Sequence, residues 1–501
     1  MKIGKRLIYN TALLTISALV MRSIGLAYQV WLVGKIGSAG IGLFQLVMSV
    51  SSLAVVLAIS GIRFACTRLV SEEIGTGHTG GVGKAMGRCI AYSLFFGLSA
   101  SAILYLTAEP IGFLWVGDAR TVQPIRLLAL SLPFISLSSV FSGYFTAIGR
   151  VYKSVAVQIA EQLFRIALVA LMLGRVPSGD IEKSCTVIVL AGTAAEVVSF
   201  ILMLLLYLGD RRKHRTEGVH SKKLTSRMLG VAVPLAVSAY ARTSLSTLEH
   251  LLVPRGLKSA GFSADEALSG YGTIQGMVFP IIGFPSCFLT ALSEMLVPEM
   301  TKAQVSGDDK YIADTANSLL EKCLIFSIGV AAILFTFSED LAMAIYGSAE
   351  AGRYIRIFSF ITPVMYLDMV TDGMLKGLGQ HLYSMKYNIL DAALSVGLVY
   401  MLLPGYGLIA YIAIICFTEC FNFTLSIQRL TQLTRIKLRS SMLLLPLACS
   451  IGAAQLLQFI SSVAGMDLSA SVIRTIAIIA VSALLYSGLI GVVNRQVGVM
   501  R

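Results

Sequence analysis

The chain has 501 residues and a mass of 53.7 kDa, of which 56% are hydrophobic and only 13% are charged. Soluble globular domains carry about 25% charged residues, so this composition all but excludes a water-soluble enzyme. The high apolar content also excludes intrinsic disorder. A mean hydropathy of +0.79, with repeated apolar runs of about 20 residues, indicates an all-α polytopic membrane protein.

The formal net charge is +13, from 40 Lys and Arg against 27 Asp and Glu. In a membrane protein such an excess marks cytoplasmic loops rather than nucleic-acid binding. None of the eight Cys forms a CxxC pair, and most lie inside apolar runs. They are therefore expected to be small buried hydrophobic residues, without a disulfide framework or a metal centre.

Fourteen candidate transmembrane helices follow from windows of hydropathy. The N-terminal apolar stretch runs to about Val33, carries Arg22 and lacks a cleavage site, so it is interpreted as a retained helix. The expected spans are 8–33, 40–68, 88–107, 122–147, 153–173, 184–207, 227–253, 269–298, 312–336, 355–377, 384–403, 407–428, 441–461 and 472–492. Pro280 and Pro285 are expected to bend the eighth span.

Lys and Arg placement predicts the orientation. With both termini in the cytoplasm, cytoplasmic segments hold about 25 of these residues and the opposite loops about 10. A basic run at 211–223 lies between spans six and seven, where it serves as a topology signal or contacts lipid headgroups. The predicted location is a cytoplasmic membrane.

Comparing the sequence with itself at a shift of about 230 residues reveals an internal repeat. The matched positions are Gly40 and Gly42 with Gly270 and Gly272, Glu109 with Glu339, Gly117 with Gly347, Ile125-Arg126 with Ile355-Arg356, Pro133 with Pro363, Leu137 with Leu367, Gly143 with Gly373, Gly149 with Gly379, Gln158 with Asn388, and Glu161 with Asp391. The shift spans six helices, an even number, so both copies enter the membrane from the same side.

This parallel repeat predicts two six-helix lobes around a central cavity, followed by a terminal helix pair. The predicted domains are 1–210 (first lobe), 211–226 (basic cytoplasmic linker), 227–432 (second lobe) and 433–501 (helices 13 and 14). Halves of this kind commonly rock to give alternating access, so the repeat points to a transporter. The sequence contains no HExxH, GxSxG or Walker A motif and no His cluster that would suggest an enzyme.

Charges inside predicted spans need a reason, because a charge at the bilayer centre costs roughly 2.5–3.5 kcal/mol. Arg22, Arg63 and Arg242 lie within spans one, two and seven. If they face one water-filled cavity they form an anion receptor, since Arg forks bind phosphate bidentately. The alternative is that each pairs with an acid or reaches the interface. Glu249 and Arg255, later in span seven and at its outer end, are further substrate-binding candidates.

A second set is acidic and polar. Asn388 and Asp391 in helix 11 and Thr418 in helix 12 form a candidate Na⁺ site, or a path for a coupling proton. The repeat counterpart weakens this reading, because Glu161 and Arg165 form an i,i+4 pair that suggests a structural role. Asp368 and Asp372, also i,i+4, lie in helix 10 and face either the cavity or the cytoplasmic water layer.

These features together resemble the multidrug/oligosaccharidyl-lipid/polysaccharide (MOP) exporter superfamily, and within it the stage V sporulation protein B-like polysaccharide transporters, which are related to the lipid II flippases. The resemblance covers essentially the whole chain. The stretches that carry it begin at residues 21, 58, 251 and 373, and read MRSIGLAYQVWLVGKIGSAGIGLFQLVMSV, AISGIRFACTRLVSEEIGTG, LLVPRGLKSAGFSADEALSGYGTIQGMVFPIIGFPSCFLTALSEMLVPEMTKA and GMLKGLGQHLYSMKYNILDAAL.

The resemblance implies a substrate with a polyprenyl tail, a pyrophosphate and a sugar headgroup. In the flippases it implies a cationic cavity with Arg on helices 1, 2 and 8; Arg22 and Arg63 match by helix, whereas Arg242 lies on helix 7. Some relatives carry a Na⁺ site from helices 7, 11 and 12, which Asn388, Asp391 and Thr418 match approximately. Membrane lipids and cell-wall synthesis enzymes are candidate partners.

Three functions remain open at this stage. The favoured one is a flippase for a lipid-linked cell-wall or polysaccharide precursor. A cation-coupled multidrug or metabolite antiporter of the same superfamily is the alternative; it should have a dominant intramembrane acid where this sequence has Arg. A membrane scaffold that recruits wall-synthesis enzymes is the third. No cofactor is expected apart from Na⁺ or H⁺ as a coupling ion.

Overall fold

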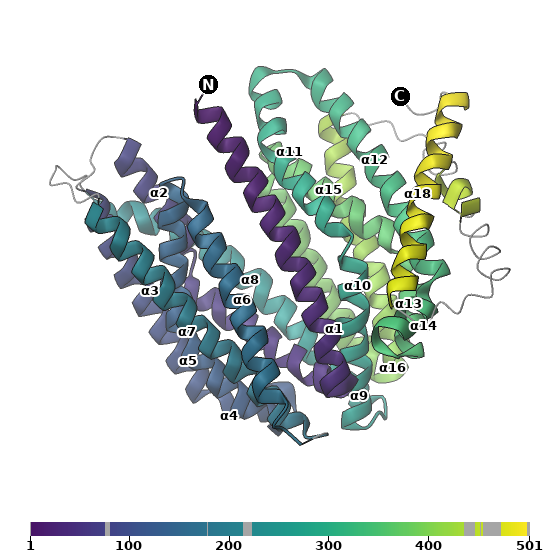
Figure 1. Ribbon diagram of the computed structural model, residues 1–501, viewed down its shortest axis with the longest axis horizontal. Coiled ribbons are helices and arrows are strands. Elements are labelled where there is room, and N and C mark those ends of the chain that lie inside the picture. Colours follow the sequence, from purple (N-terminus) through teal and green to yellow (C-terminus); the bar gives the residue numbers. More distant parts are fainter. Residues whose placement is uncertain are drawn as a thin grey trace. The chain divides into compact units, whose positions relative to one another are not determined.

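A computed structural model describes residues 2–75, 81–177, 179–213, 223–434, 446–450, 452–453 and 472–497, and these ranges contain helices and no strand (Figure 1). Nine helices among the described residues are long and apolar enough to cross a membrane. Some of these nine helices each contain two predicted spans, because the helix continues through a kink between them. The protein is therefore an all-α integral membrane protein.

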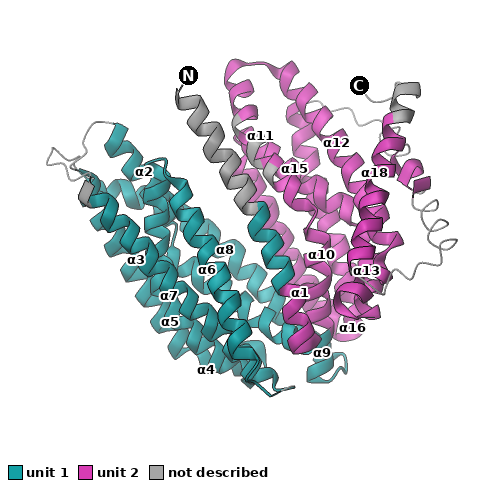
Figure 2. Cartoon of the chain, in the orientation of Figure 1, with its two compact units in different colours: residues 1–28, 39–269 teal, residues 29–38, 270–501 magenta. Residues whose placement is uncertain are grey.

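The chain forms two compact units, residues 1–28 with 39–269 and residues 29–38 with 270–501 (Figure 2). The elements up to residue 272 are α1 Lys2–Ile59, α2 Ile62–Gly75, α3 Gly81–Leu106, α4 Ala108–Pro110, η1 Ile111–Val116, η2 Ala119–Thr121, α5 Val122–Ala147, α6 Val151–Leu173, α7 Ile181–Lys213, α8 Leu224–Ser259 and α9 Ala264–Gly272. The later elements are η3 Thr273–Val278, α10 Phe279–Gly283, α11 Ser286–Ser306, α12 Asp309–Thr336, α13 Ser338–Tyr346, α14 Ala349–Ser359, α15 Thr362–Gly377, α16 His381–Thr434 and α18 Val472–Val497.

Several predicted spans coincide with helices, such as 122–147 with α5 and 153–173 with α6. The first two spans join in α1 through a break at Gly37, which has φ 71° and ψ 179°. Spans eleven and twelve likewise join in α16 through Gly407. Most of the predicted span 441–461, and residues 214–222 of the predicted linker, lie outside the described residues.

The eighth predicted span, 269–298, is not one helix. It consists of α9, the π-helical turn η3, α10 and α11. Pro280 and Pro285 explain the interruptions, because proline has no N–H to donate and its ring clashes with the preceding turn. The helix is interrupted at these prolines, and the predicted bend itself stays a prediction.

The second predicted span, 40–68, is divided between two helices. Helix α1 ends at Ile59, and the next residues, Ser60 and Gly61, have positive φ angles of 46° and 71°. A Cβ at Gly61 would lie 2.5 Å from the carbonyl oxygen of Ala232. Glycine at this position thus permits both the turn into α2 and the close approach of α8.

Contacts in the two halves of the chain recur at the shift of 230 residues. Arg126 pairs with Glu109 at 2.6 Å and lies 5.8 Å from the ring centroid of Tyr105. Arg356 pairs with Glu339 at 3.2 Å and lies 5.8 Å from the ring centroid of Phe335. All three residue positions correspond, so the same interaction is built twice, in agreement with the sequence repeat.

The close packing of two helices also recurs. A Cβ at Gly143 on α5 would lie 2.6 Å from the carbonyl oxygen of Arg63, and one at Gly373 on α15 would lie 2.7 Å from the Cβ of Ser293. Position 293 is the counterpart of position 63. Small residues therefore let corresponding helices approach closely in both copies.

The compact units divide the chain after residue 269, rather than within the predicted linker at 211–226. Helix α8 packs against α1 and α2 inside the first unit: Tyr240 and Ser60 hydroxyls are 2.6 Å apart, and Thr247 donates to the Ser49 carbonyl at 3.1 Å. The compact units are defined by contacts between residues, whereas the predicted domains are defined by the sequence repeat. The predicted domain boundaries therefore stay a prediction.

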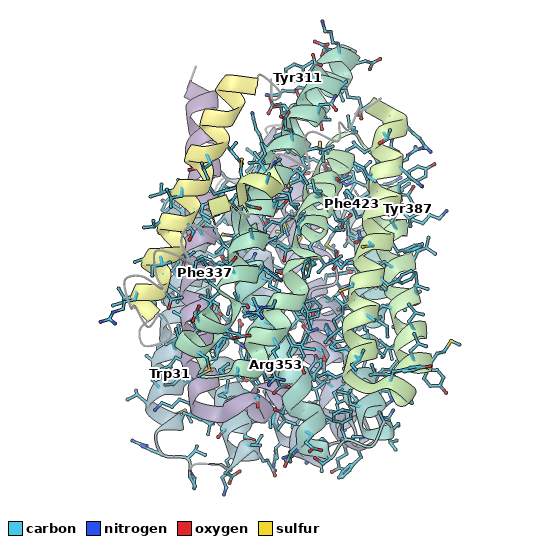
Figure 3. All side chains as sticks on the ribbon, turned by 90° about the vertical axis from the view of Figure 1, so that its right-hand side faces the viewer. Trp31, Tyr311, Phe337, Arg353, Tyr387 and Phe423 are labelled. Carbon is cyan, nitrogen blue, oxygen red and sulfur yellow. The ribbon has the colours of Figure 1, made fainter. Side chains whose placement is uncertain are left out.

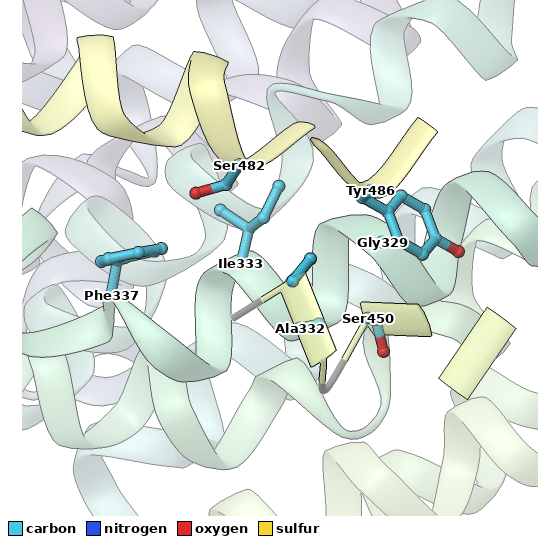
Figure 4. Close-up of a pocket in the computed structure, with 8 residues that line it drawn as sticks. Gly329, Ala332, Ile333, Phe337, Ser450, Ser482 and Tyr486 are labelled. Atoms are coloured by element: carbon cyan, nitrogen blue, oxygen red, sulfur yellow. The ribbon is translucent and has the colours of Figure 1, made fainter. Parts of the chain in front are cut away.

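The last described helix, α18, packs on α12 through Tyr486. Its hydroxyl donates to the Ile325 carbonyl at 2.7 Å, and its ring covers Gly329, where a Cβ would lie 2.4 Å from a ring carbon (Figure 4). Phe337 follows one end of α12 and Tyr311 lies near the other (Figure 3). This glycine–tyrosine contact fixes the terminal helix to the second unit.

Replacing Gly143 with Ala should destabilise the protein by about 1–3 kcal/mol, because the added methyl group must displace the backbone of α2. Gly192→Ala is the matched control on α7, since no atom lies within 4 Å of its added Cβ. Thermal unfolding in detergent measures both. Equal midpoints for the two variants would contradict the close packing of α2 on α5.

Candidate functional site

The three cationic residues predicted to bind an anion all belong to the first unit. Arg22 lies on α1, Arg63 on α2 and Arg242 on α8, and each residue is exposed in the structure. No acidic group lies within ion-pair distance of Arg63 or Arg242 in the described part of the chain. These two guanidinium groups are thus not neutralised by an internal acid there.

Arg165 shows the contrasting behaviour. It contacts Glu161 at 2.5 Å and Glu196 at 3.1 Å. The predicted i,i+4 pair is therefore confirmed as a structural ion pair. Sequence reasoning missed Glu196, because it lies on the next helix, α7, and no spacing rule connects it to α6.

Contacts along α8 fix its register against α1 and α2. Thr247 contacts Ser49, Tyr240 contacts Ser60, and Arg227 contacts Glu72. The residue numbers run in opposite directions, so the segments are antiparallel. This register sets Arg63 beside residues 232–237 of α8, so Arg242 lies about 8–15 Å further along the helix axis.

One end of this helix pair is held by charge. Arg227 pairs with Glu72 and, at 3.1 Å, with the fully buried Glu73. Beside these groups is a cavity of about 280 Å³ lined by Ala65, Arg68, Leu69, Glu72, Arg227, Gly230 and Val231. The sequence did not indicate this cavity, because its acids and Arg227 are more than 150 residues apart.

Arg255 has a structural partner. Its guanidinium donates to the Leu114 carbonyl in η1, and Lys258 donates to the Gly117 carbonyl at 3.0 Å. Arg120 adds an ion pair with Asp265 at 3.0 Å. These contacts tie the end of α8 to the connection between α3 and α5. A substrate contact by Arg255, or by the half-buried Glu249, stays a prediction.

Asp118 anchors this connection. Burial acts to raise the pKa of its carboxyl, but the side-chain and backbone hydrogen bonds from Arg120 outweigh burial and hold the pKa below its usual value. A carboxyl with a lowered folded-state pKa contributes stability above its unfolded pKa, near 4, and this contribution is lost as the pH falls through the folded-state pKa.

Asp118→Asn should therefore lower the thermal midpoint at pH 7 relative to the unmodified protein. The difference should shrink as the pH falls below about 4, where the unmodified carboxyl becomes protonated. Thermal unfolding of both proteins at a series of pH values measures this. A difference that is independent of pH would show that the Asp118 charge does not stabilise the fold.

The predicted Na⁺ ligands Asn388, Asp391 and Thr418 all lie on α16. Asn388 donates to the Ser384 carbonyl at 2.9 Å, and Thr418 to the Ile415 carbonyl at 3.3 Å. No group of three His, Cys, Asp or Glu within the described ranges could hold a metal ion. These contacts do not test whether the three residues bind Na⁺, so the Na⁺ site stays a prediction.

Comparison with known proteins shows the family. The model of a family described as "Polysaccharide biosynthesis protein" matches residues 7–304, more than half of the chain. The chain is 23% identical over 406 residues to "Stage V sporulation protein B" of Bacillus subtilis (strain 168), covering 80% of this chain and 78% of that protein. It is 22% identical over 338 residues to "Probable lipid II flippase MurJ" of Rhizobium tropici, covering 62% and 60%.

Solved structures show the same fold. "Lipid II flippase MurJ, inward closed conformation" matches with a TM-score of 0.70 at 13% identity, over 97% of this chain and 99% of that chain. An inward-facing multidrug resistance MATE family transporter of the MOP superfamily matches with a TM-score of 0.60 at 16% identity, over 85% and 100%. Together with the family model and the two relatives, this fold confirms the predicted resemblance.

Proposed function

Because this chain belongs to the polysaccharide biosynthesis protein family of the MOP superfamily, we propose that it is a flippase for a lipid-linked sugar precursor. The substrate class is a polyprenyl pyrophosphate that carries a cell-wall or polysaccharide headgroup, of which lipid II is an example. The two curated relatives and the flippase-like fold support this class. The protein acts in the cytoplasmic membrane with both termini in the cytoplasm.

The observation that carries the proposal is the pair of unneutralised guanidinium groups of Arg63 and Arg242. They lie on antiparallel neighbouring segments, about 8–15 Å apart along the axis. Arg22 on α1 is the third cation of the proposed site. A charge within a membrane span is costly unless a group of opposite charge accompanies it, and the pyrophosphate of the substrate supplies that charge in a water-filled cavity.

The proposed mechanism follows from the chemistry of these groups. The guanidinium forks hold the pyrophosphate through charge-assisted hydrogen bonds while the polyprenyl tail stays in the bilayer. Rocking of the lobes then exposes the headgroup outside. The membrane potential favours outward movement of negative charge by about 2.3 kcal/mol per charge per 100 mV. Cell-wall synthesis enzymes would receive the exported precursor.

Transport of a lipid-linked sugar by the reconstituted protein tests the proposed site. Arg63→Ala and Arg242→Ala should each lower the flipping rate by about 10-fold or more, because a charge-assisted hydrogen bond is worth about 1.5–3 kcal/mol. Arg68→Ala is the matched control, since Arg68 is on the same helix but pairs with Glu72 at 2.9 Å.

Two results would contradict this assignment. An unchanged flipping rate after Arg22 and Arg242 are both replaced with Ala would remove the guanidinium groups from the site. Transport of cationic drugs driven by an ion gradient, without transport of lipid-linked sugars, would favour the antiporter alternative.

A further inference from the structure

The core of the first unit contains four buried side chains whose sulfur atoms form a cluster. They come from three helices: Cys66 from α2, Met86 and Cys89 from α3, and Met228 from α8. Cys66 Sγ lies 3.6 Å from Met86 Sδ, and Cys89 Sγ lies 3.8 Å from Met228 Sδ. The two thiols also hydrogen-bond each other, which joins the two pairs. Both thiols are free, so no disulfide occupies the cluster.

The measured sulfur separations are compatible with a single metal ion. Around a metal with bonds of about 2.3 Å to sulfur, two ligands in a tetrahedral arrangement lie about 3.8 Å apart. The separations of 3.6 Å and 3.8 Å within the two pairs are close to this value. An ion can therefore bind both sulfurs of each pair without moving them apart.

The ligand types select the ion. Thiolate and thioether sulfurs are soft donors that favour Cu⁺, whereas Mg²⁺ and Ca²⁺ prefer oxygen. Zn²⁺ is bound by Cys, His and carboxylate side chains, so the two methionines do not favour it. On binding, Cu⁺ replaces the proton of one thiol, and the other thiol keeps its proton. The thiolate and the ion then carry no net charge together, which suits a site inside a membrane protein.

The internal repeat shows that packing at these positions does not require sulfur. Three of the four positions have hydrocarbon side chains in the second copy, namely Leu296, Ala316 and Leu319. Cys66 shares a buried core with Val140. Their counterparts, Leu296 and Val370, share the equivalent core of the second unit. The sulfur atoms are therefore a feature of the first copy that packing alone does not explain.

A route for the ion lies beside the cluster. The cavity of about 280 Å³ at α2 and α8 is lined by Ala65 and Arg227, which are the chain neighbours of Cys66 and Met228. Leu69, three residues after Cys66 on α2, also lines it. The cavity thus reaches the residues next to one thiol and one thioether of the cluster.

We propose that one Cu⁺ ion binds between α2, α3 and α8, held by the sulfur atoms of Cys66, Met86, Cys89 and Met228. The sequence predicted buried cysteines without a metal centre, because these residues come from three helices and form no CxxC pair. The bound ion would link α8 to α2 and α3. Binding of the ion does not rest on the flippase function proposed above.

Titration of the purified full-length protein with Cu⁺ under anaerobic conditions, in competition with the chelator bathocuproine disulfonate, tests the site. We expect one Cu⁺ per chain, with X-ray absorption that shows sulfur neighbours. Cys66→Ala, Cys89→Ala and Met228→Leu should each weaken binding at least about 10-fold, a loss typical even for removing a hydrogen-bond partner of a metal ligand. Met228→Leu removes the thioether and nearly keeps the side-chain volume, so the core stays packed.

Cys323→Ala is the matched control, because Cys323 is a buried thiol in the core of the second unit. It should bind Cu⁺ as the unmodified protein does. The absence of saturable Cu⁺ binding to the unmodified protein would overturn the proposal, as would unchanged affinity in both Cys66→Ala and Met228→Leu. Binding of Zn²⁺ in preference to Cu⁺, with no effect of Met228→Leu, would also overturn it, since the thioether would then not be a ligand.

Discussion

The cost of placing a charge inside a membrane is the constraint on which this structure depends. With 13% charged residues in a chain that spans the bilayer many times, each ionisable group within a helix needs a partner. Arg165 has two acids, and Asp372 has a lysine. In the described part of the chain, Arg63 and Arg242 of the first unit have no acid within ion-pair distance, which leaves both guanidinium groups able to bind an anionic ligand.

The internal repeat separates structural charges from functional ones without any comparison to other proteins. The ion pair of Arg126 with Glu109 recurs as Arg356 with Glu339, so this pair belongs to the fold that both copies share. Arg63 corresponds to Ser293, and Asp368 to Ser138. Each copy thus carries a charge where the other has a hydroxyl, and both copies pack in the same way around these positions. The proposed anion site is a difference between two otherwise similar halves.

The guanidinium groups of the first unit suit a transporter that moves an anionic headgroup, because they can bind the negative charge of the proposed substrate. A ligand bound there can favour one conformation of the protein only if it binds the two conformations with different affinity. The helix breaks at Gly37, Ser60–Gly61 and Gly407 are places where the backbone already departs from a regular helix.

Much of the architecture followed from the sequence, because hydropathy and repeat periodicity are local properties. Spans such as 122–147 match the helices to within a few residues, and residues matched at a shift of 230 make corresponding contacts in both copies. The pair of Glu161 with Arg165 was also predictable, because one helical turn separates the residues. The breaks at Ser60 and within residues 269–298 were harder to place, since they depend on neighbouring helices as well as on proline.

Composition, spacing and charge placement determined by themselves that this is a multi-pass helical membrane protein with a duplicated unit and cations within its spans. Only the tertiary structure decided which charged groups have partners, because a partner on another helix can be from 31 to 141 residues away in the sequence. Glu196 beside Arg165, Leu114 beside Arg255, and Asn422 beside Asp368 are all partners of this kind. Local sequence patterns carry no record of such contacts, since these depend on which helix faces pack against each other.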